Sequence, residues 1–327
     1  MKLFAVSVRE DEKSYFAMLP ERFGITVQET AEDITEDVLD SLNGFDTISV
    51  LGTQKIDAPM LDRLMAAGIR NLTTRTIGYN HIDLDHAREI GMHVFNASYE
   101  PNSVADYTIM MMLMCLRHYK ESLWRTNCND FSLDGLEGRQ MKDLTVGVMG
   151  TGRIGSMVIR ELSGFGCRIL AYDVRESEEV KKYAEYVDLD TLYRESDIIT
   201  LHMPLLKSTY HIINKDSIAK MKNTVTLINC ARGALMDIED LIDGIEKQKI
   251  GALGLDVMEH EEGIVHLDLK LDIISNRQMA YLRQFPNVVH TQHMAFYTDA
   301  AVRDMVLTSA GAVVAASKGE KTRNQLC

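Results

Sequence analysis

The chain has 327 residues, of which 46% are hydrophobic and 25% are charged, and its net charge at pH 7 is −13. This length predicts two domains, because one hydrophobic core rarely serves so many residues. The acidic balance argues against nucleic-acid binding, which needs basic surface to neutralise phosphates. The five cysteines show no CxxC pair and no metal-ligand spacing, so we expect free thiols, no metal site and a cytoplasmic protein.

The first hundred residues alternate between short apolar runs and amphipathic segments. The N-terminal run is too short for a signal peptide or a membrane span, so we expect a buried strand there and no membrane partner. The expected strands are Leu3–Val8, Thr47–Leu51, Asn71–Thr74 and His93–Asn96. Apolar residues recur at helical spacing in Thr35–Leu42 and Ala58–Ala67. Strands that alternate with helices predict a parallel sheet covered on both faces.

The pattern changes at Pro101. Ser103 is suited to cap a long helix rich in methionine, and methionines at such positions are typical packing residues. Residues 127–143 are expected to form a loop-rich connection. A second run of strands and helices then extends to about His293, which predicts a second α/β domain.

The second run contains six expected strands, the number in a complete doubly wound domain. They are Thr145–Gly150, Arg168–Asp173, Ile198–His202, Thr224–Asn229, Ala252–Asp256 and Val288–Thr291. An amphipathic helix from Asp299 to about Ser317 is too short to be a domain, so we expect it to pack on the first one. The prediction is a discontinuous substrate domain of residues 1–99 and 299–327 and a dinucleotide-binding domain of residues 100–298. The ligand site is expected in the cleft between them.

A glycine motif follows the first strand of the second domain. Gly150 suits a tight turn, Gly152 lets backbone approach a pyrophosphate, and Gly155 allows a helix to pack close to the sheet. A helix is expected over Met157–Phe165, and the next strand ends at Asp173, where a carboxylate can bind an adenosine ribose. A turn that only packs tightly is the alternative, but it leaves the acid unexplained. The order of these features predicts a dinucleotide site.

Three side chains that follow expected strands suit the reduction of a 2-oxo acid. Arg232 can grip a carboxylate with its guanidinium fork, and the alternative is a surface arginine in a turn. His293, where a strand ends and the last helix begins, is suited to donate a proton; the alternatives are a capping or a core histidine, and His290 competes for the role. Glu261 can favour the charged imidazole, although it lies in a charged run typical of a solvated loop.

The chain resembles the D-isomer-specific 2-hydroxyacid dehydrogenase family over essentially its whole length. The segments that carry the resemblance are Arg75–Asp83, Pro101–Thr108, the glycine motif, Leu201–Leu205, Asn229–Gly233, Leu255–Glu259 and His293–Thr298. It implies an α/β fold of two doubly wound parallel-sheet domains, with a Rossmann NAD domain inserted into a flavodoxin-like substrate domain. It also implies an NAD-dependent oxidoreductase that forms a homodimer and acts on a small 2-oxo or 2-hydroxy acid, with reduction of pyruvate to D-lactate as the expected reaction.

The resemblance also assigns site residues. The catalytic residues that it implies are Arg232, Glu261 and His293. The positions expected to contact NAD are Gly150, Gly152, Arg153, Ile154, Gly155, Tyr172, Asp173, His202, Pro204, Cys230 and Asp256. The expected substrate contacts are the backbone N–H groups of Ile77 and Gly78, together with Leu51, Arg232, His293 and Tyr297.

Two positions depart from the family pattern. Gln292 stands where the family usually has proline before the catalytic histidine, which removes a backbone restraint. Leu51 stands where some D-lactate enzymes carry tyrosine, which leaves room for a larger 2-oxo acid. A dehydrogenase of the 2-hydroxyisocaproate or phenyllactate type is therefore one alternative. An NADH-sensing scaffold, similar to the transcriptional corepressors that share this fold, is the alternative from another class.

Overall fold

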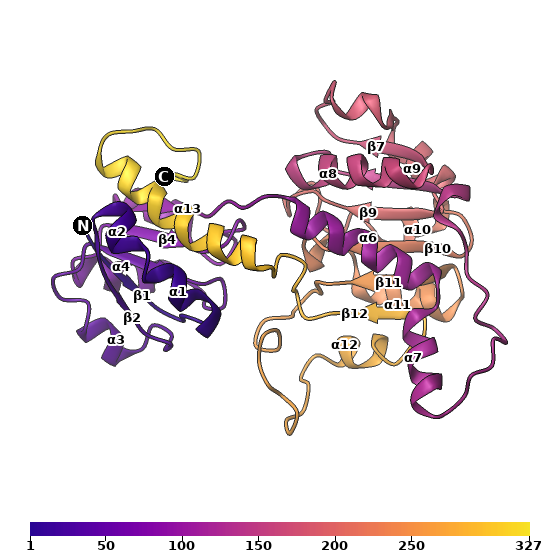
Figure 1. The fold of residues 1–327 in the computed structure, drawn as a ribbon, viewed down its shortest axis with the longest axis horizontal. Coiled ribbons are helices and arrows are strands. Elements are labelled where there is room, and N and C mark those ends of the chain that lie inside the picture. The colour runs from indigo at the N-terminus through magenta and orange to yellow at the C-terminus, as the bar shows by residue number, and fades with distance from the viewer. The chain divides into compact units, whose positions relative to one another are not determined.

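The computed structural model describes residues 1–327, and the chain divides into two compact units. Unit 1 comprises Met1–Glu100 and Tyr297–Cys327, and unit 2 comprises Pro101–Phe296. Each unit is built on a fully parallel sheet with helices on both faces (Figure 1). This topology confirms the expected fold class of two doubly wound α/β domains.

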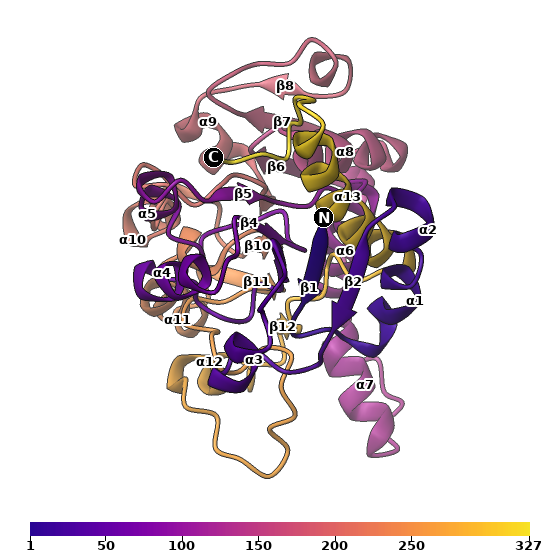
Figure 2. The same ribbon diagram turned by 90° about the vertical axis from the view of Figure 1, so that its left-hand side faces the viewer.

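The sheet of unit 1 has five strands in the order β2-β1-β3-β4-β5. Their bounds are β1 (Lys2–Ala5), β2 (Thr26–Glu29), β3 (Thr47–Val50), β4 (Asn71–Thr74) and β5 (His93–Phe95). This is the flavodoxin-like order, which reverses between β1 and β3. The sequence pattern does not predict β2, which lies beside β1 at the sheet edge (Figure 2), because most of this strand is exposed and it lacks an apolar run.

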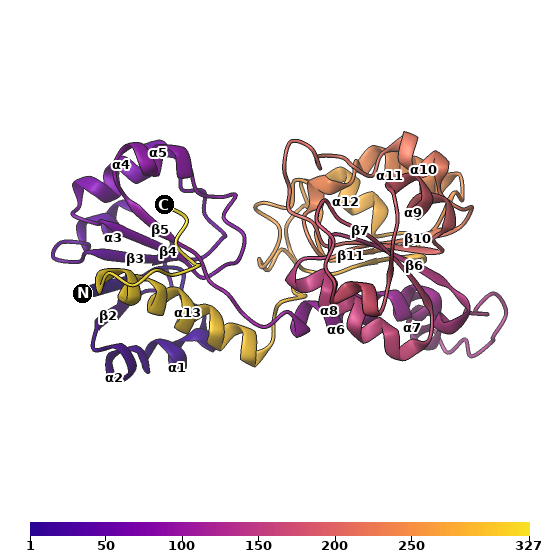
Figure 3. The same ribbon diagram turned by 90° about the horizontal axis from the view of Figure 1, so that it is seen from above.

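Two layers of helices cover the sheet of unit 1 (Figure 3). One layer contains α3 (Glu36–Asp40), α4 (Ala58–Ala66) and α5 (Leu84–Glu89), and the other contains α1 (Lys13–Phe16), α2 (Leu19–Phe23) and α13 (Asp299–Ser317). Alternate residues of β1 face opposite layers: Phe4 packs with the first, whereas Leu3 and Ala5 pack with the second. Both faces of this short strand are therefore buried in the hydrophobic core of unit 1.

By length and composition alone, helix α13 is long and apolar enough to cross a membrane. However, 56% of its most apolar 18-residue stretch is buried inside the protein. Val306 and Ala310 belong to the same apolar cluster as Leu3 and Phe16. Buried side chains occur around most of the helix, so it is not the amphipathic helix that the sequence suggests. It is a core helix that packs on the sheet of unit 1.

The sheet of unit 2 has seven strands in the order β12-β11-β10-β9-β6-β7-β8. Their bounds are β6 (Thr145–Met149), β7 (Arg168–Tyr172), β8 (Glu185–Tyr186), β9 (Ile198–Leu201), β10 (Val225–Asn229), β11 (Ile250–Leu255) and β12 (Val288–His290). The strand order reverses between β6 and β9, as in dinucleotide-binding domains. The expected six strands omit β8, because two residues form no recognisable apolar run.

The helices of unit 2 also form two layers (Figure 3). One layer contains α6 (Asn102–Leu116), α7 (Tyr119–Asn127) and α8 (Arg153–Leu162), and the other contains α9 (Leu189–Glu195), α10 (Lys215–Lys220), α11 (Ile238–Glu246) and α12 (Arg277–Leu282). Helix α6 begins directly after Pro101, so Ser103 lies within its first turn and does not cap it. Proline tolerates this position because it lacks an N–H group to satisfy.

Candidate active site

The glycine motif follows β6, where the strand order of unit 2 reverses. Gly150 has φ +93°, and a Cβ atom there would lie 2.7 Å from the carbonyl group of His202. A Cβ atom on Gly155 would lie 1.9 Å from the Gly150 oxygen, whereas one on Gly152 would meet no atom within 4 Å. Packing therefore requires glycine at 150 and 155, and the surface at Gly152 is open to a ligand.

Helix α8 begins at Arg153 and not at Met157, so the predicted start is wrong. Gly155 lies in the first turn and hides the helical periodicity there. Gly152 precedes the helix and provides no side-chain cap. Because a helix N-terminus attracts anions, the first turn that contains Arg153 and Ile154 is suited to a phosphate.

Asp173 directly follows Tyr172, the last residue of β7. Its Oδ2 atom accepts the Thr151 backbone N–H at 2.6 Å, and its Oδ1 atom accepts the Arg175 N–H at 3.0 Å. The Thr151 hydroxyl lies 2.7 Å from the hydroxyl of Tyr186 in β8, a link that the sequence does not signal. The carboxylate thus lies against the glycine motif, next to the open surface.

His202 and Pro204 follow β9, and Cys230 follows β10, so all three lie at the carboxyl edge of the sheet. Nε2 of His202 lies 3.0 Å from the Thr200 hydroxyl, and burial lowers the pKa of His202 to about 3. This ring is therefore neutral at neutral pH. Burial raises the pKa of the Cys230 thiol, so the thiol stays protonated and is not a nucleophile.

His293 and Glu261 form a close pair. Nδ1 of His293 lies 2.6 Å from Oε1 of Glu261. The other carboxylate oxygen, Oε2, accepts the Met258 backbone N–H at 2.8 Å. Because the carboxylate engages Nδ1, Nε2 is the atom of His293 that is placed to exchange a proton with a ligand.

His293 lies in the segment between β12 and α13, and not at a strand end or a helix start as predicted. Its φ of +55° is left-handed and strained for a histidine. The buried carboxylate of Asp256 holds this segment: Oδ1 accepts the Thr291 hydroxyl at 2.6 Å and the Met294 N–H at 2.9 Å. Oδ2 accepts the Ala295 N–H at 2.8 Å. Asp256, a predicted NAD contact, thus fixes the backbone on both sides of the histidine.

Arg232 follows β10, which neighbours the strand that precedes Glu261. Asn229 fixes this loop, because its Nδ2 donates to the Arg232 carbonyl at 2.9 Å and its Oδ1 accepts the Ala231 N–H at 3.0 Å. A Cβ atom on Gly233 would lie 2.0 Å from backbone of Met258, so the two loops touch. The sequence motif contains Asn229, but its positioning role was not predicted.

His266 is a further residue near the pair that the sequence does not signal. It belongs to the same loop as Glu261, and its Nε2 lies 3.2 Å from the carbonyl oxygen of His293. Its ring contacts Phe296 edge-on, with ring centroids 6.3 Å apart. His266 therefore adds a third contact to His293, beside the Glu261 contact with its ring and the Asp256 contacts with its neighbours.

Ile77 and Gly78 follow β4 in unit 1. The Ile77 carbonyl accepts Nδ2 of Asn96 at 2.8 Å, and the Gly78 carbonyl accepts the Thr76 hydroxyl at 2.6 Å. Neither backbone N–H of this pair donates to a protein acceptor. Two adjacent free N–H groups on a fixed backbone suit an anion.

The other two predicted substrate contacts also lie on unit 1. Leu51 directly follows β3 and is buried. The Tyr297 ring lies under the guanidinium of Arg9, with the guanidinium carbon 5.4 Å from the ring centroid. Burial and a hydrogen bond to Asp11 raise the pKa of the Tyr297 hydroxyl, which therefore stays protonated.

Known proteins resemble the chain over its whole length. Residues 109–295 match the family model described as D-isomer specific 2-hydroxyacid dehydrogenase, NAD binding domain. The chain is 44% identical to an aromatic 2-oxoacid reductase of Clostridium sporogenes over 94% of this chain and 93% of the relative. It is 36% identical to a D-lactate dehydrogenase of Escherichia coli over 100% of both chains. A crystal structure of a D-lactate dehydrogenase of Treponema pallidum matches with a TM-score of 0.91 and 30% identity, covering 100% of both chains.

Proposed function

Because the chain belongs to the D-isomer-specific 2-hydroxyacid dehydrogenase family, we propose that it reduces pyruvate to D-lactate. As a member of this family it is an oxidoreductase, and its cofactor is NAD. The observation that carries the proposal is the 2.6 Å contact between His293 and Glu261, because carbonyl reduction needs a proton donor that is held in position. Pyruvate is the substrate proposed first, since the D-lactate dehydrogenase of Escherichia coli aligns over the full length.

The glycine motif fits the dinucleotide, which when bound supplies the hydride for the carbonyl carbon. The open surface at Gly152 and the uncapped start of α8 support a pyrophosphate site there. We assign Asp173 to the adenosine ribose, where its negative charge opposes the 2′-phosphate of NADP. The remaining NAD contacts are assigned to Gly150, Arg153, Ile154, Gly155, Tyr172, His202, Pro204, Cys230 and Asp256.

We assign the proton transfer to Nε2 of His293. Glu261 holds the opposite edge of the ring through Nδ1, and Nε2 donates its proton to the carbonyl oxygen. In the reverse direction, the neutral ring accepts the proton of the substrate hydroxyl. Asp256 acts through the backbone, because it fixes the segment on both sides of the histidine.

We assign the substrate carboxylate to Arg232. A guanidinium forms two parallel hydrogen bonds with a carboxylate, which also orients the adjacent carbonyl. The free N–H groups of Ile77 and Gly78 are assigned to an anionic group of the substrate, because backbone donors hold an anion without side-chain motion. Leu51 and Tyr297 are assigned to the remainder of the substrate.

A bulkier 2-oxo acid is the second candidate substrate. The 44% identity to an aromatic 2-oxoacid reductase favours it, and so does Leu51, which the resemblance identifies as a departure from the tyrosine of some D-lactate enzymes. An aliphatic side chain at this position leaves more volume than a phenol ring. Phenylpyruvate and 2-oxoisocaproate therefore belong in the same experiment as pyruvate.

The test is steady-state oxidation of NADH with pyruvate, 2-oxoisocaproate and phenylpyruvate, with chiral analysis of each product. The proposal predicts D-products and the highest kcat/KM with pyruvate. A higher kcat/KM with phenylpyruvate would replace pyruvate by the second candidate. Tight NADH binding without oxidation by any 2-oxo acid would contradict the enzymatic proposal and favour an NADH-sensing scaffold.

We further propose that the protein is a cytoplasmic homodimer. Large apolar side chains are exposed on α6, α7 and the following loop, and they are Met110, Tyr119, Leu123, Trp124, Phe131 and Leu133. Burial of such side chains against a second copy removes apolar area from water. All five cysteines are free, which suits a reducing compartment. Light scattering should give twice the chain mass of 36.9 kDa, and a mass of one chain would contradict the dimer.

A further inference from the structure

A histidine outside the proposed catalytic set connects the loop after Arg232 with the loop of Glu261. His211 lies between β9 and α10, and its ring stacks on Tyr210 with centroids 3.8 Å apart. Nδ1 of His211 lies 3.1 Å from Oδ2 of Asp237, and Nε2 lies 3.0 Å from Oε2 of Glu259. The two nitrogens of one ring thus face carboxylates from two different loops.

Asp237 connects this ring to the Arg232 side. Its carboxylate accepts the N–H groups of the first turn of α11, so its position is fixed by that helix. The backbone adds a second connection, because the His211 N–H donates to the Ala234 carbonyl at 3.0 Å. The loop after Arg232 is therefore attached to His211 by both side chain and main chain.

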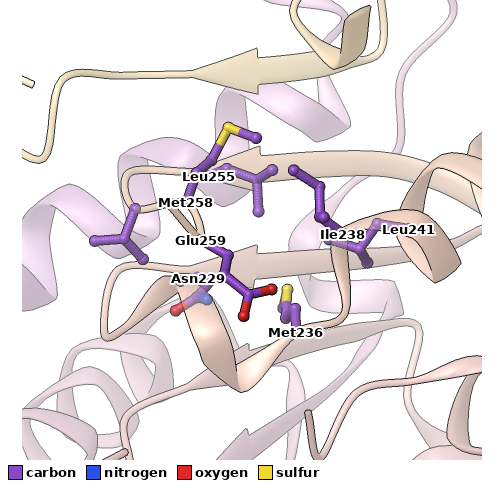
Figure 4. A pocket seen from close by; sticks show the side chains of 9 residues that line it. Asn229, Met236, Ile238, Leu241, Leu255, Met258 and Glu259 are labelled. Carbon is purple, nitrogen blue, oxygen red and sulfur yellow. The ribbon is translucent and has the colours of Figure 1, made fainter. Parts of the chain in front are cut away.

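Glu259 connects the ring to the other loop, two residues before Glu261. Its side chain is only 10% exposed. Figure 4 shows it among Asn229, Met236 and Met258 at a pocket of about 10 Å³, which has room for no more than one water molecule. Nε2 of His211 and the Tyr210 hydroxyl are its side-chain partners, and the hydroxyl donates to it at 3.3 Å. A carboxylate in this setting needs hydrogen-bond donors to offset its burial.

We infer that His211 is a positioning residue, whose bridge between Asp237 and Glu259 sets the spacing of Arg232 from Glu261 and thereby from His293. The inference rests on the proposed function. The ring reaches the two carboxylates through its two nitrogens, one on each side. The titratable groups that face it are Asp237, Glu259 and Tyr210.

Two conservative variants separate the two halves of the bridge. The carboxamide nitrogen of His211→Asn lies near the position of Nδ1 and keeps the Asp237 contact, whereas that of His211→Gln lies near Nε2 and keeps the Glu259 contact. His211→Asn should lower kcat/KM for the 2-oxo acid about tenfold, as expected for loss of a charged hydrogen bond, and His211→Gln should lower it less. Glu259→Gln should resemble His211→Asn.

The double variant distinguishes positioning from separate effects. His211→Asn combined with Glu259→Gln should lose no more activity than His211→Asn alone, because both changes act on the same contact. The dissociation constant of NADH should change less than kcat/KM, since the glycine motif and Asp173 lie on other strands. The control is His86→Asn, which breaks a histidine–carboxylate pair of 2.8 Å with Asp62 on unit 1 and should leave kcat/KM unchanged.

Three results would overturn the inference. In the first, His211→Asn has the kcat/KM of the wild type. In the second, the double variant loses the product of the two single losses in kcat/KM, and in the third, the loss of activity in His211→Asn is fully accounted for by weaker NADH binding and a lower Tm. Failure of the proposed function is a separate result, because the wild-type protein would then fail to oxidise NADH with any of the 2-oxo acids. The positioning role would fail with it.

Discussion

Glu261 meets His293 through one carboxylate oxygen, 2.6 Å from Nδ1, while its other oxygen is occupied by the Met258 N–H. Rotation of the carboxylate would break both of these hydrogen bonds, so the carboxylate is fixed relative to the ring. This geometry leads to the first prediction, which concerns the charge on that carboxylate.

Glu261→Gln keeps the size of the side chain and removes its charge. The imidazole then loses its charged partner, so kcat for pyruvate reduction at neutral pH should drop about tenfold or more. The measurement is steady-state kcat at saturating pyruvate and NADH. Glu262→Gln, a change at an exposed neighbour, is the control and should leave kcat unaltered. An unchanged kcat in Glu261→Gln would refute the pairing.

The glycine motif predicts opposite outcomes at two positions. A Cβ atom on Gly152 meets no protein atom within 4 Å, so Gly152→Ala should fold with a Tm near that of the wild type but bind NADH about tenfold more weakly. A Cβ atom on Gly155 lies 1.9 Å from the Gly150 oxygen, so Gly155→Ala should lose about 1–3 kcal/mol of stability. Thermal unfolding and NADH fluorescence test both changes. Equal effects of the two changes would contradict a ligand surface at Gly152.

Asp173 should govern the choice between NAD and NADP. Its oxygens accept the N–H groups of Thr151 and Arg175, so Asp173→Asn is the suitable variant, because one acceptor oxygen remains. Loss of the negative charge should raise the ratio of kcat/KM with NADPH to that with NADH about tenfold. An unaltered ratio would argue against the ribose assignment.

His202 should make stability depend on pH. Burial lowers its pKa from 6.5 to about 3, so between these values the unfolded chain binds a proton that the folded chain does not. The free energy of unfolding therefore falls as pH drops from about 6.5 toward 3. His202→Gln keeps a donor or acceptor for Thr200 and should flatten this dependence.

His86 provides a control of opposite sign. Its pKa is raised by the hydrogen bond to Asp62, so its contribution to stability is present below the unfolded pKa and is lost as pH rises through the folded one. His86→Gln should therefore lower stability on the acidic side only. Denaturant titrations between pH 5 and 7 compare the two variants with the wild type. Parallel curves for His202→Gln and the wild type would contradict the neutral buried ring.

Local patterns reveal some of these features and hide others. The buried strands coincide with apolar runs of the sequence. The glycines at 150 and 155 are required by close backbone contacts, which the glycine pattern of dinucleotide-binding folds predicts. The strands β2 and β8 are not predicted from the sequence, because β2 is mostly exposed at the sheet edge and β8 has only two residues. The strained φ of His293 is also not predicted from the sequence, since it depends on hydrogen bonds that Asp256 accepts from residues 35 to 39 positions away.

The most direct test of the account is single-turnover reduction of pyruvate by His293→Gln, with NADH binding measured on the same sample. The glutamine lacks a titratable nitrogen, so we expect the rate of NADH oxidation to fall by about 10² to 10⁴ while the Kd for NADH stays close to the wild-type value. A rate near that of the wild type, with NADH still bound, would contradict the assignment of His293 as the proton donor.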